Sequence, residues 1–441
     1  MATYITKTQV SATDRKKFTF SAWIKRSKLS SGSQNIYESF YDASNRITFW
    51  INSSDQLRVW YPSSGSTYAE LNSSQLLRDC NAWYHVVLTV DSTESTQADR
   101  VKVYLNGSRI TAWGTNTVNV PLNGANDIGT TGYKHNISRY GTGSGDTFFG
   151  LMSHIHLTDG YAYDASAFGS TDSTTGEWKI NTSPSVTYGN NGFFILKDGN
   201  STTDHSGNSA SFTTSGTLTK TEDCPSNVFC TMNPLMIKPS ATNTFANGNN
   251  TVTINATDAS VGATLGASSG KFYWEQKWTQ QGANDRWGVC PDDASMSNHP
   301  RTTGIGWDTA STQFYLLGSA VSGSWGGSIG TSEIIQIALD LDNSALYLGV
   351  NGTWRNSGNP TSGSSRTGAV NFSSSSLVGK FLLPAFGKGN QDNSTMQYNF
   401  GNGYFGTTAV SSAGTNASGN GIFEYDVPTG YTALSTKGLN L

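Results

Sequence analysis

Apolar and polar positions alternate with a period of two along many short segments of this chain. In 17–24, every second residue from Phe18 to Ile24 is apolar, and 46–51 repeats the pattern. Because successive side chains of a strand point to opposite sides, this period predicts β-strands that bury one side. No long apolar stretch has the 3.6-residue period of a helix, so we expect an all-β protein. Further strands are expected at 56–61, 83–91, 101–105, 148–157, 192–197, 270–278, 334–341, 345–350, 381–386, 396–400 and 421–425.

Two of the expected strands end in Asn-Gly, a dipeptide typical of tight hairpin turns because both residues accept positive φ. The first is Asn106-Gly107 and the second is Asn351-Gly352. Each follows an earlier strand that ends in Asp. This correspondence predicts that the two halves share one hairpin of two related sandwiches. The alternative is chance, since Asn-Gly turns are common.

The length of 441 residues indicates two or three domains. Only 13% of residues are charged, 12% are aromatic and 48 are glycine, a balance that fits short strands joined by many polar turns. We therefore expect two antiparallel β-sandwich domains in tandem. The expected divisions are a first sandwich at 1–164, a connector packed on it at 165–231, a second sandwich at 232–408 and a C-terminal tail at 409–441.

Charge and hydropathy exclude two classes of partner. The formal net charge is −3 and no Lys/Arg cluster stands out, so we expect no nucleic-acid binding. No run approaches ~18 apolar residues, so we expect no membrane insertion. The first residues lack a basic region followed by an apolar core, which predicts synthesis in a cytoplasm without a signal peptide. Of the four cysteines, Cys224 and Cys230 are close enough in sequence to bridge, and two unbridged thiols are the alternative.

Two known modules resemble the two halves. Residues 18–160 resemble laminin-G-like (concanavalin A-like) jelly rolls, and residues 232–405 resemble SPRY modules. The first resemblance rests on four segments in the family's order: Phe18–Ile24, Trp83–Val87, Val103–Gly107 and Phe149–Gly150 before Ile155. The second rests on five segments: Ser269–Glu275, Trp287–Val289, Ile337–Asp342, Val350–Gly352 and Tyr398–Gly401.

The pairing of these modules resembles structural proteins of marine tailed phages. The resemblance implies a virion protein at the particle surface: a capsid decoration protein, or a fibre or tail adhesin, made in the host cytoplasm. Its partners would be other capsid or tail proteins and host-surface glycans, and a homo-oligomer, such as a trimer, is expected. A soluble carbohydrate-binding lectin of cellular origin is the first alternative, and a glycan-degrading enzyme is the second.

Enzyme motifs are weak in this sequence. The Glu-x-Asp-x-x-Glu spacing of jelly-roll glycosidases, which brings two acids to one glycosidic bond, does not occur. Asp204-His205-Ser206 holds three triad residue types in a row, but a triad needs them to converge in space. We interpret this segment as a turn capped by Asp204. We therefore expect no enzymatic activity and assign no catalytic residue.

Metal ligands are equally sparse. His154 and His156 lie two apart on one expected strand, but no third ligand is apparent, so we interpret them as outward-facing side chains. Calcium, which needs several oxygen ligands, has loose candidates only, and we assign no metal or cofactor. The candidates are Asp55, Asp91, Asp127 and Asp146.

Glycan binding uses exposed aromatic rings beside amides and carboxylates, because apolar sugar faces stack on rings while hydroxyls take hydrogen bonds. In the first module the candidates are Trp50, Trp60 and Tyr61. The SPRY resemblance places ligand loops in turn-rich segments of the second module. The candidates there are Asp285, Arg286, Trp307, Tyr315 and Trp325. The alternative is that these aromatic residues fill cores and sheet interfaces.

Overall fold

The computed structural model describes residues 3–143, 145–197, 201–239, 241–390 and 392–440. The chain divides into two units, Met1–Lys220 and Thr221–Leu441, both built from mainly antiparallel sheets. This architecture confirms the expected all-β class. No helix in the described ranges is long and apolar enough to cross a membrane. The helical segments are short: α1 (Pro300–Thr303) and 3-10 turns at Gln97–Asp99, Ala165–Ala167, Arg355–Ser357, Pro360–Ser365 and Gly438–Asn440.

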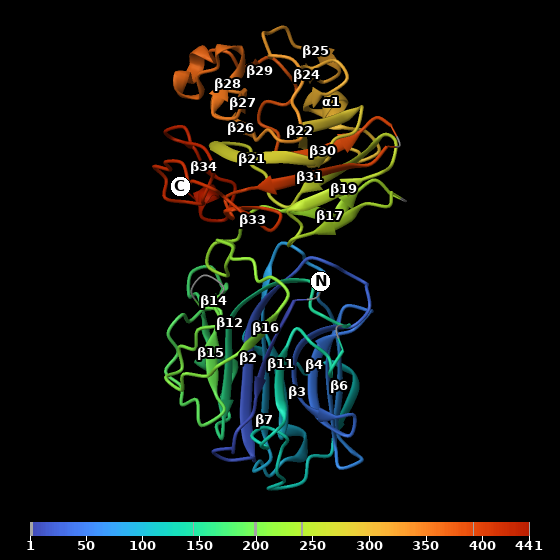
Figure 1. Ribbon diagram of the computed structural model, residues 1–441, viewed down its shortest axis with the longest axis vertical. Coiled ribbons are helices and arrows are strands. Elements are labelled where there is room, and N and C mark those ends of the chain that lie inside the picture. Colours follow the sequence, from blue (N-terminus) through green and yellow to red (C-terminus); the bar gives the residue numbers. More distant parts are fainter. Residues whose placement is uncertain (1–2, 144, 198–200, 240, 391, 441) are drawn as a thin grey trace. The chain divides into compact units, whose positions relative to one another are not determined.

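The first unit is a sandwich of two large sheets (Figure 1). The eight-stranded sheet runs in the order β10 (Trp113–Val118), β6 (Ser66–Leu76), β5 (Gln56–Ser63), β4 (Asn45–Ile51), β3 (Gln34–Asp42), β11 (Lys134–Ile137), β1 (Tyr4–Thr8) and β16 (Thr213–Ser215). The six-stranded sheet runs in the order β15 (Phe193–Ile195), β12 (Gly150–Asp159), β2 (Lys17–Arg26), β7 (Trp83–Asp91), β8 (Val101–Leu105) and β9 (Ser108–Arg109). A separate pair joins β13 (Gly169–Thr171) to β14 (Trp178–Ile180).

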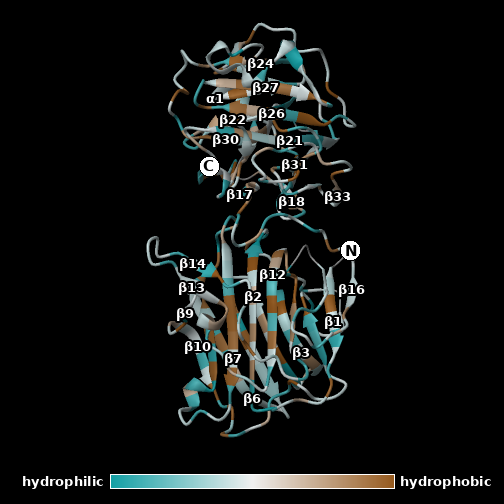
Figure 2. Cartoon of the chain, turned by 90° about the vertical axis from the view of Figure 1, so that its left-hand side faces the viewer, coloured by the Kyte–Doolittle hydropathy of each residue, from teal (hydrophilic) through white to brown (hydrophobic). Residues whose placement is uncertain are grey.

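The core of the first unit lies between these sheets. Apolar and polar residues alternate along its strands (Figure 2). The apolar residues of these strands form one buried cluster. Phe20 of β2 stacks on Tyr37 of β3 with ring centroids 4.3 Å apart, and Phe49 of β4 meets Phe20 edge-on. All three rings are fully buried, and each contributes about 1.5–3 kcal/mol to folding. The two-residue period therefore decides which side of each strand faces the core.

The second unit has the same two-sheet plan. Its seven-stranded sheet runs in the order β17 (Met232–Ile237), β20 (Ala259–Ala263), β30 (Leu382–Lys388), β22 (Asp285–Pro291), β23 (Ile305–Asp308), β24 (Gln313–Leu316) and β25 (Ser319–Ala320). Its nine-stranded sheet comprises β18 (Thr244–Ala246), β19 (Thr251–Ile254), β31 (Ser394–Asn399), β21 (Lys271–Gln280), β26 (Ile335–Asp340), β27 (Ala345–Val350) and β28 (Thr353–Trp354), with β29 (Val370–Asn371) beside β27 and β34 (Thr432–Ala433) beside β21. A small hairpin joins β32 (Tyr404–Phe405) to β33 (Thr408–Ala409).

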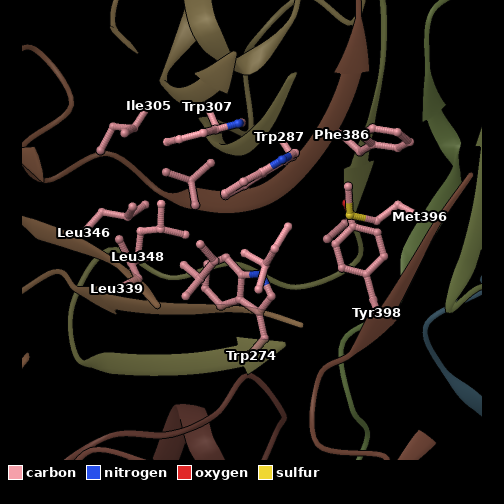
Figure 3. Close-up of a cluster of buried hydrophobic side chains, with 14 of the residues drawn as sticks. Trp274, Trp287, Ile305, Trp307, Leu339, Leu346, Leu348, Phe386, Met396 and Tyr398 are labelled. Atoms are coloured by element: carbon pink, nitrogen blue, oxygen red, sulfur yellow. The ribbon is translucent and has the colours of Figure 1, made fainter. Parts of the chain in front are cut away.

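Indole rings dominate the core of the second unit (Figure 3). Trp287 of β22 stacks on Trp307 of β23, with centroids 5.8 Å apart and planes inclined by 17°. Trp274 of β21 enters the same core from the opposite sheet and is fully buried. The high aromatic content of the sequence thus serves packing here.

The two Asn-Gly dipeptides form equivalent hairpin turns. Asn106 and Gly107 have φ of 47° and 81°, and Asn351 and Gly352 have φ of 48° and 82°. In each turn the Asn backbone and side chain bond to the strand before the hairpin, at His85 in the first unit and at Ile334 in the second. The strands β7, β8 and β9 therefore form the same meander as β26, β27 and β28.

The observed division of the chain differs from the expected one. Strand β15 pairs with β12 and β16 pairs with β1, so 165–220 adds strands to both sheets of the first unit and is part of it. Residues 221–231 belong to the second unit. The tail packs on the nine-stranded sheet, where β34 runs parallel to β21. The strand expected at 192–197 is observed as β15, but its pairing with β12 could not be read from the sequence. The other added strands, β16 and β34, are only two or three residues long and show no clear alternation.

Two smaller points concern individual segments. Residues 421–425 do not form the expected strand, and only an isolated bridge joins Ile422 to Asn402. Among the described residues, no disulfide joins Cys224 to Cys230. The Cys224 thiol lies 3.4 Å from the Ser226 hydroxyl, whereas Cys230 packs in the core.

Candidate functional site

Two of the candidate tryptophans lie together on the outer side of the eight-stranded sheet. Thr48 pairs with Trp60 across β4 and β5, and Trp50 pairs with Arg58 one step further along. Residues that pair directly point to the same side of a sheet, so both indoles face away from the core. Each is half-buried, which leaves part of the ring open to a ligand. We call this surface the tryptophan face, formed by Trp50, Arg58, Trp60, Glu70 and Asn72.

Polar groups surround the two indoles at hydrogen-bonding distance from one another. The Arg58 guanidinium lies 5.2 Å from the Trp50 ring centroid and 2.5 Å from a Glu70 carboxylate oxygen. Asn72 donates to Gln56 Oε1 at 3.1 Å and accepts from Asn52 Nδ2 at 3.2 Å. Both Arg58 and Glu70 keep about a third of their side chain exposed. The tryptophan face therefore combines ring surfaces with donors and acceptors held in fixed positions, as sugar recognition requires.

A row of directly paired residues crosses the tryptophan face from one carboxylate to another. Glu38 pairs with Thr48, Thr48 with Trp60, and Trp60 with Glu70. Three strand spacings of ~4.8 Å place the backbones at Glu38 and Glu70 ~14 Å apart. Glycosidase acid pairs are separated by about 5–9.5 Å. Glu38 is fully buried, so it does not face a ligand on the tryptophan face together with Glu70.

Glu38 is fully buried at its end of that row. Its carboxylate accepts from Gly141 N at 2.6 Å, from Asn136 Nδ2 at 3.1 Å and from the Thr48 hydroxyl at 3.2 Å. Burial raises the pKa of Glu38 despite these donors. The bonded contacts give Glu38 a structural role beneath the segment around Gly141.

Four candidates lie inside the protein and must be withdrawn as stacking or contact surfaces. Tyr61 is fully buried because it is in phase with the inward-facing Leu57 and Val59. Trp307 and Trp325 pack in the core of the second unit with exposures of 0% and 3%. Asp285 is also fully buried, where it pairs with Lys388 at 2.9 Å. For these positions the alternative interpretation, core packing, is correct.

Arg286 and Tyr315 lie on the other side of the seven-stranded sheet, away from the core. Arg286 pairs across the strands with Asp308, and its Nε lies 3.3 Å from that carboxylate. Arg301, from α1, approaches the same carboxylate at 2.8 Å and stacks over the Tyr315 ring at 4.0 Å. The structure thus brings two of the five second-module candidates together, around an Asp and an Arg that the sequence analysis did not select.

The histidines and the Asp-His-Ser segment have structural roles. Ile155 and Leu157 lie in the core of the first unit as expected, and His156 lies on the opposite side of β12. Phe168, Tyr188 and Phe194 cover His156 there, so it is buried and not exposed to solvent. Strand β12 has a bulge between Ser153 and His156, and His154 is buried as well. The ring of His156 packs on Phe194 at 3.9 Å, and burial lowers its pKa well below the usual range. Asp204 accepts from Ser206 N at 2.9 Å and from the Ser206 hydroxyl at 2.8 Å, as expected of a capped turn.

The four carboxylates considered for calcium do not form a common site. Two of them are paired with Lys or Arg. Asp55 pairs with Arg26 and Arg78, each at 2.9 Å, and Asp91 pairs with Lys17 at 3.0 Å. Burial raises the pKa of Asp127 to about 6, and Asp146 is exposed. Across the described part of the chain, no group of three or more His, Cys, Asp or Glu side chains is arranged to hold a metal ion.

The sequence analysis missed Arg58, Glu70 and Asn72 on the tryptophan face. The signal was available for Arg58, because it is in phase with Trp60 and out of phase with Leu57. Glu70 and Asn72 follow the same rule along β6, between the buried Ala69, Leu71 and Ser73. Their meeting with the indoles depends on strand register, which alternation within one strand does not specify.

Comparison with known proteins agrees with the first unit's architecture. Residues 2–160 match a family model described as the concanavalin A-like lectin/glucanases superfamily. The first unit therefore contains the jelly-roll module that the resemblance implied. No curated protein matches the chain in sequence.

Solved structures that align with parts of the chain include SPRY domains and a pentraxin. The SPRY domain of human HERC1 aligns at 11% identity and a TM-score of 0.29, covering 38% of this chain and 96% of that domain. The PSpry domain of TRIM65 aligns at 14% identity and a TM-score of 0.29, covering 38% and 91%. A heptameric SAP-like pentraxin from Limulus polyphemus aligns at 16% identity and a TM-score of 0.26, covering 35% and 69%.

Proposed function

We propose that this chain is a non-enzymatic glycan-binding protein whose first unit binds sugar on the tryptophan face. The observation that carries the proposal is the position of Trp50 and Trp60 on neighbouring strands, partly exposed and on the same side of the sheet. Apolar faces of sugar rings stack on such indoles. Arg58, Glu70 and Asn72 supply charged and amide groups beside them for the hydroxyls. The family described as lectins and glucanases, which residues 2–160 match, supports this ligand class.

The binding site is a flat strand surface, so we expect modest affinity at each site. Small contacts of this kind bury little surface, and several copies in one assembly would raise the overall affinity by avidity. A homo-oligomer is part of the proposal for that reason. Light scattering on the purified protein tests it, and a monomer at micromolar concentration would contradict it.

The direct test is a glycan array followed by calorimetry with the best ligand. Trp60→Ala removes a ring that faces the ligand and leaves the core packing unchanged. We therefore expect affinity to fall about tenfold or more while the protein stays folded. Tyr161→Ala is the matched control, because Tyr161 is another exposed aromatic residue of the first unit but lies outside the tryptophan face. Equal binding by both variants would exclude the tryptophan face as the site.

Absence of catalysis is the second part of the proposal. It is supported by the burial of Glu38, whose carboxylate is bonded to Gly141, Asn136 and Thr48 and so is not available beside Glu70. We expect no reducing-sugar release from any glycan that binds. Reproducible release that is lost in Glu70→Gln, but retained in Glu94→Gln, would instead identify a glycan-degrading enzyme.

We further propose that the protein is displayed at the surface of a phage particle, as a decoration protein or as part of a fibre or tail. The order of the two modules, which resembles marine phage structural proteins, supports this location. Mass spectrometry of purified particles should find the chain at stoichiometric amounts, and antibody labelling should find it on the outside. A gene outside any phage locus, together with absence from particles, would favour a cellular lectin.

A further inference from the structure

A groove at one edge of the eight-stranded sheet gathers cations that have no acidic partner. Its volume is about 670 Å³, within the ~300–1,000 Å³ that ligand sites occupy. It lies where β16 stops pairing with β1, since that pairing covers only Tyr4–Thr6 of the longer strand. Its lining includes Lys7, Lys134 and Arg139 and no Asp or Glu.

The charges in this groove are unusual for the first unit. Most other cations there pair with a carboxylate, as Arg26, Arg58, Lys17, Lys102, Arg109 and Lys179 do. Within the ranges that the structure describes, Lys7, Lys134 and Arg139 have no carboxylate within the 4.0 Å of an ion pair. The guanidinium of Arg139 stacks on the Tyr4 ring at 4.5 Å and donates to the carbonyls of Thr142 and Gly143, which together hold it at the groove.

The nearest acids are already engaged elsewhere. Asp159 and Asp204 act on Lys7 from a distance, but Asp204 accepts from Ser206 N and Ala210 N, and Asp159 accepts from Asn191 N. Burial lowers the pKa of Lys7, which means that its ammonium has lost water without gaining a bonded anion. An anionic ligand would restore that missing interaction.

The neutral part of the lining indicates which anion fits. Seven Ser, Thr and Asn residues of the lining carry hydroxyl or amide groups, and the apolar side chains there are few. Hydroxyl and amide groups bond to sugar hydroxyls, whereas Lys and Arg bond to sulfate or carboxylate groups. The neutral polar residues are Thr6, Thr8, Asn190, Asn208, Ser211, Thr213 and Ser215.

We propose that this groove is a second binding site, which takes a sulfated or uronate-bearing glycan. A line of directly paired residues crosses the sheet from the groove to the tryptophan face. It runs from Thr6 through Asn136, Glu38 and Thr48 to Trp60. Four strand spacings therefore separate the groove from Trp60 by ~19 Å along the sheet. The groove is distinct from the tryptophan face, and either site can fail without the other.

The test measures binding of dextran sulfate, polygalacturonate and neutral dextran oligosaccharides of equal length. Lys7→Gln and Lys134→Gln each remove a cation whose side chain has no bonded partner in the described structure. Each substitution should weaken binding of the anionic probe about tenfold, because a charge-assisted hydrogen bond is lost. Lys179→Gln is the control, since it removes an exposed cation outside the groove. Raising salt should weaken the anionic binding as well.

Saturable binding of either anionic probe, lowered by both groove substitutions and unchanged by the control, supports the site, and the preferred probe identifies sulfate or carboxylate. Three results would overturn it: no saturable binding, equal loss in Lys179→Gln, or tighter binding of a poly(dT) oligonucleotide that the groove substitutions also weaken. The Trp60→Ala variant should retain anionic binding, which separates this test from that of the tryptophan face.

Discussion

Replacing Glu275 by Gln should change how the stability of the second unit depends on pH. Glu275 lies on β21 and is fully buried beneath the C-terminal tail. Its carboxylate accepts from Glu424 N at 2.9 Å, from Tyr425 N at 2.8 Å and from the Tyr273 hydroxyl at 2.9 Å. Glu275 therefore fastens the tail to the nine-stranded sheet.

The magnitude follows from the protonation of this carboxyl. Burial raises the pKa of Glu275 from 4.5 to about 7, although the hydrogen bonds from Glu424 and Tyr425 oppose the shift. Between these two pH values the folded protein binds a proton that the unfolded chain does not, so stability falls as pH rises. The difference of about 2.5 pH units corresponds to about 3 kcal/mol. This contribution is fully present below pH ~4.5 and is lost as pH rises through ~7.

Glu275→Gln removes the titration and places an amide N–H against one of the tail's backbone N–H groups. The mismatch should cost about 1–3 kcal/mol. Urea unfolding of both proteins from pH 5 to pH 8 gives the free energy of unfolding of each at every pH. In the difference between wild type and the variant, the contributions of the other titrating groups cancel. We expect wild type to lose about 2.5 kcal/mol of its advantage across this range, because part of the effect is already lost at pH 5. Hydrogen exchange at Glu424 and Tyr425 should also quicken in the variant. A difference that is constant with pH would refute the reasoning.

Three further substitutions test the packing. Trp287→Ala empties a fully buried site and should lower the free energy of unfolding of the second unit by about 3–5 kcal/mol in urea. Gly107→Ala should lower the melting temperature of the first unit more than Gly65→Ala. The two glycines have similar φ (81° and 80°), but a methyl group at Gly107 would lie 2.4 Å from the Trp178 ring. Asp55→Asn leaves a fully buried arginine without its carboxylate and should cost about 3–5 kcal/mol by urea unfolding.

Alternation succeeded where both sides of a strand carry side chains of contrasting polarity. Trp60 follows Val59 and precedes Tyr61, so its outward direction is readable from the sequence and the structure bears it out. The inward direction of Trp307 is harder to predict from the sequence, because its neighbours in Ile305–Asp308 include a glycine, which carries no polarity signal. Its place in the core depends on the stacked Trp287 of the next strand.

The sequence by itself determined the all-β class, the Asn-Gly hairpins and the inward side of the long strands. These follow from local physics: positive φ at two residues and a period of two. Only the tertiary structure decided that 165–220 completes the first unit, that the tail covers Glu275, and that Arg58 and Glu70 meet beside the two indoles. Those outcomes depend on which strands pair and in what register, and pairing is a property of contacts between segments far apart in the chain.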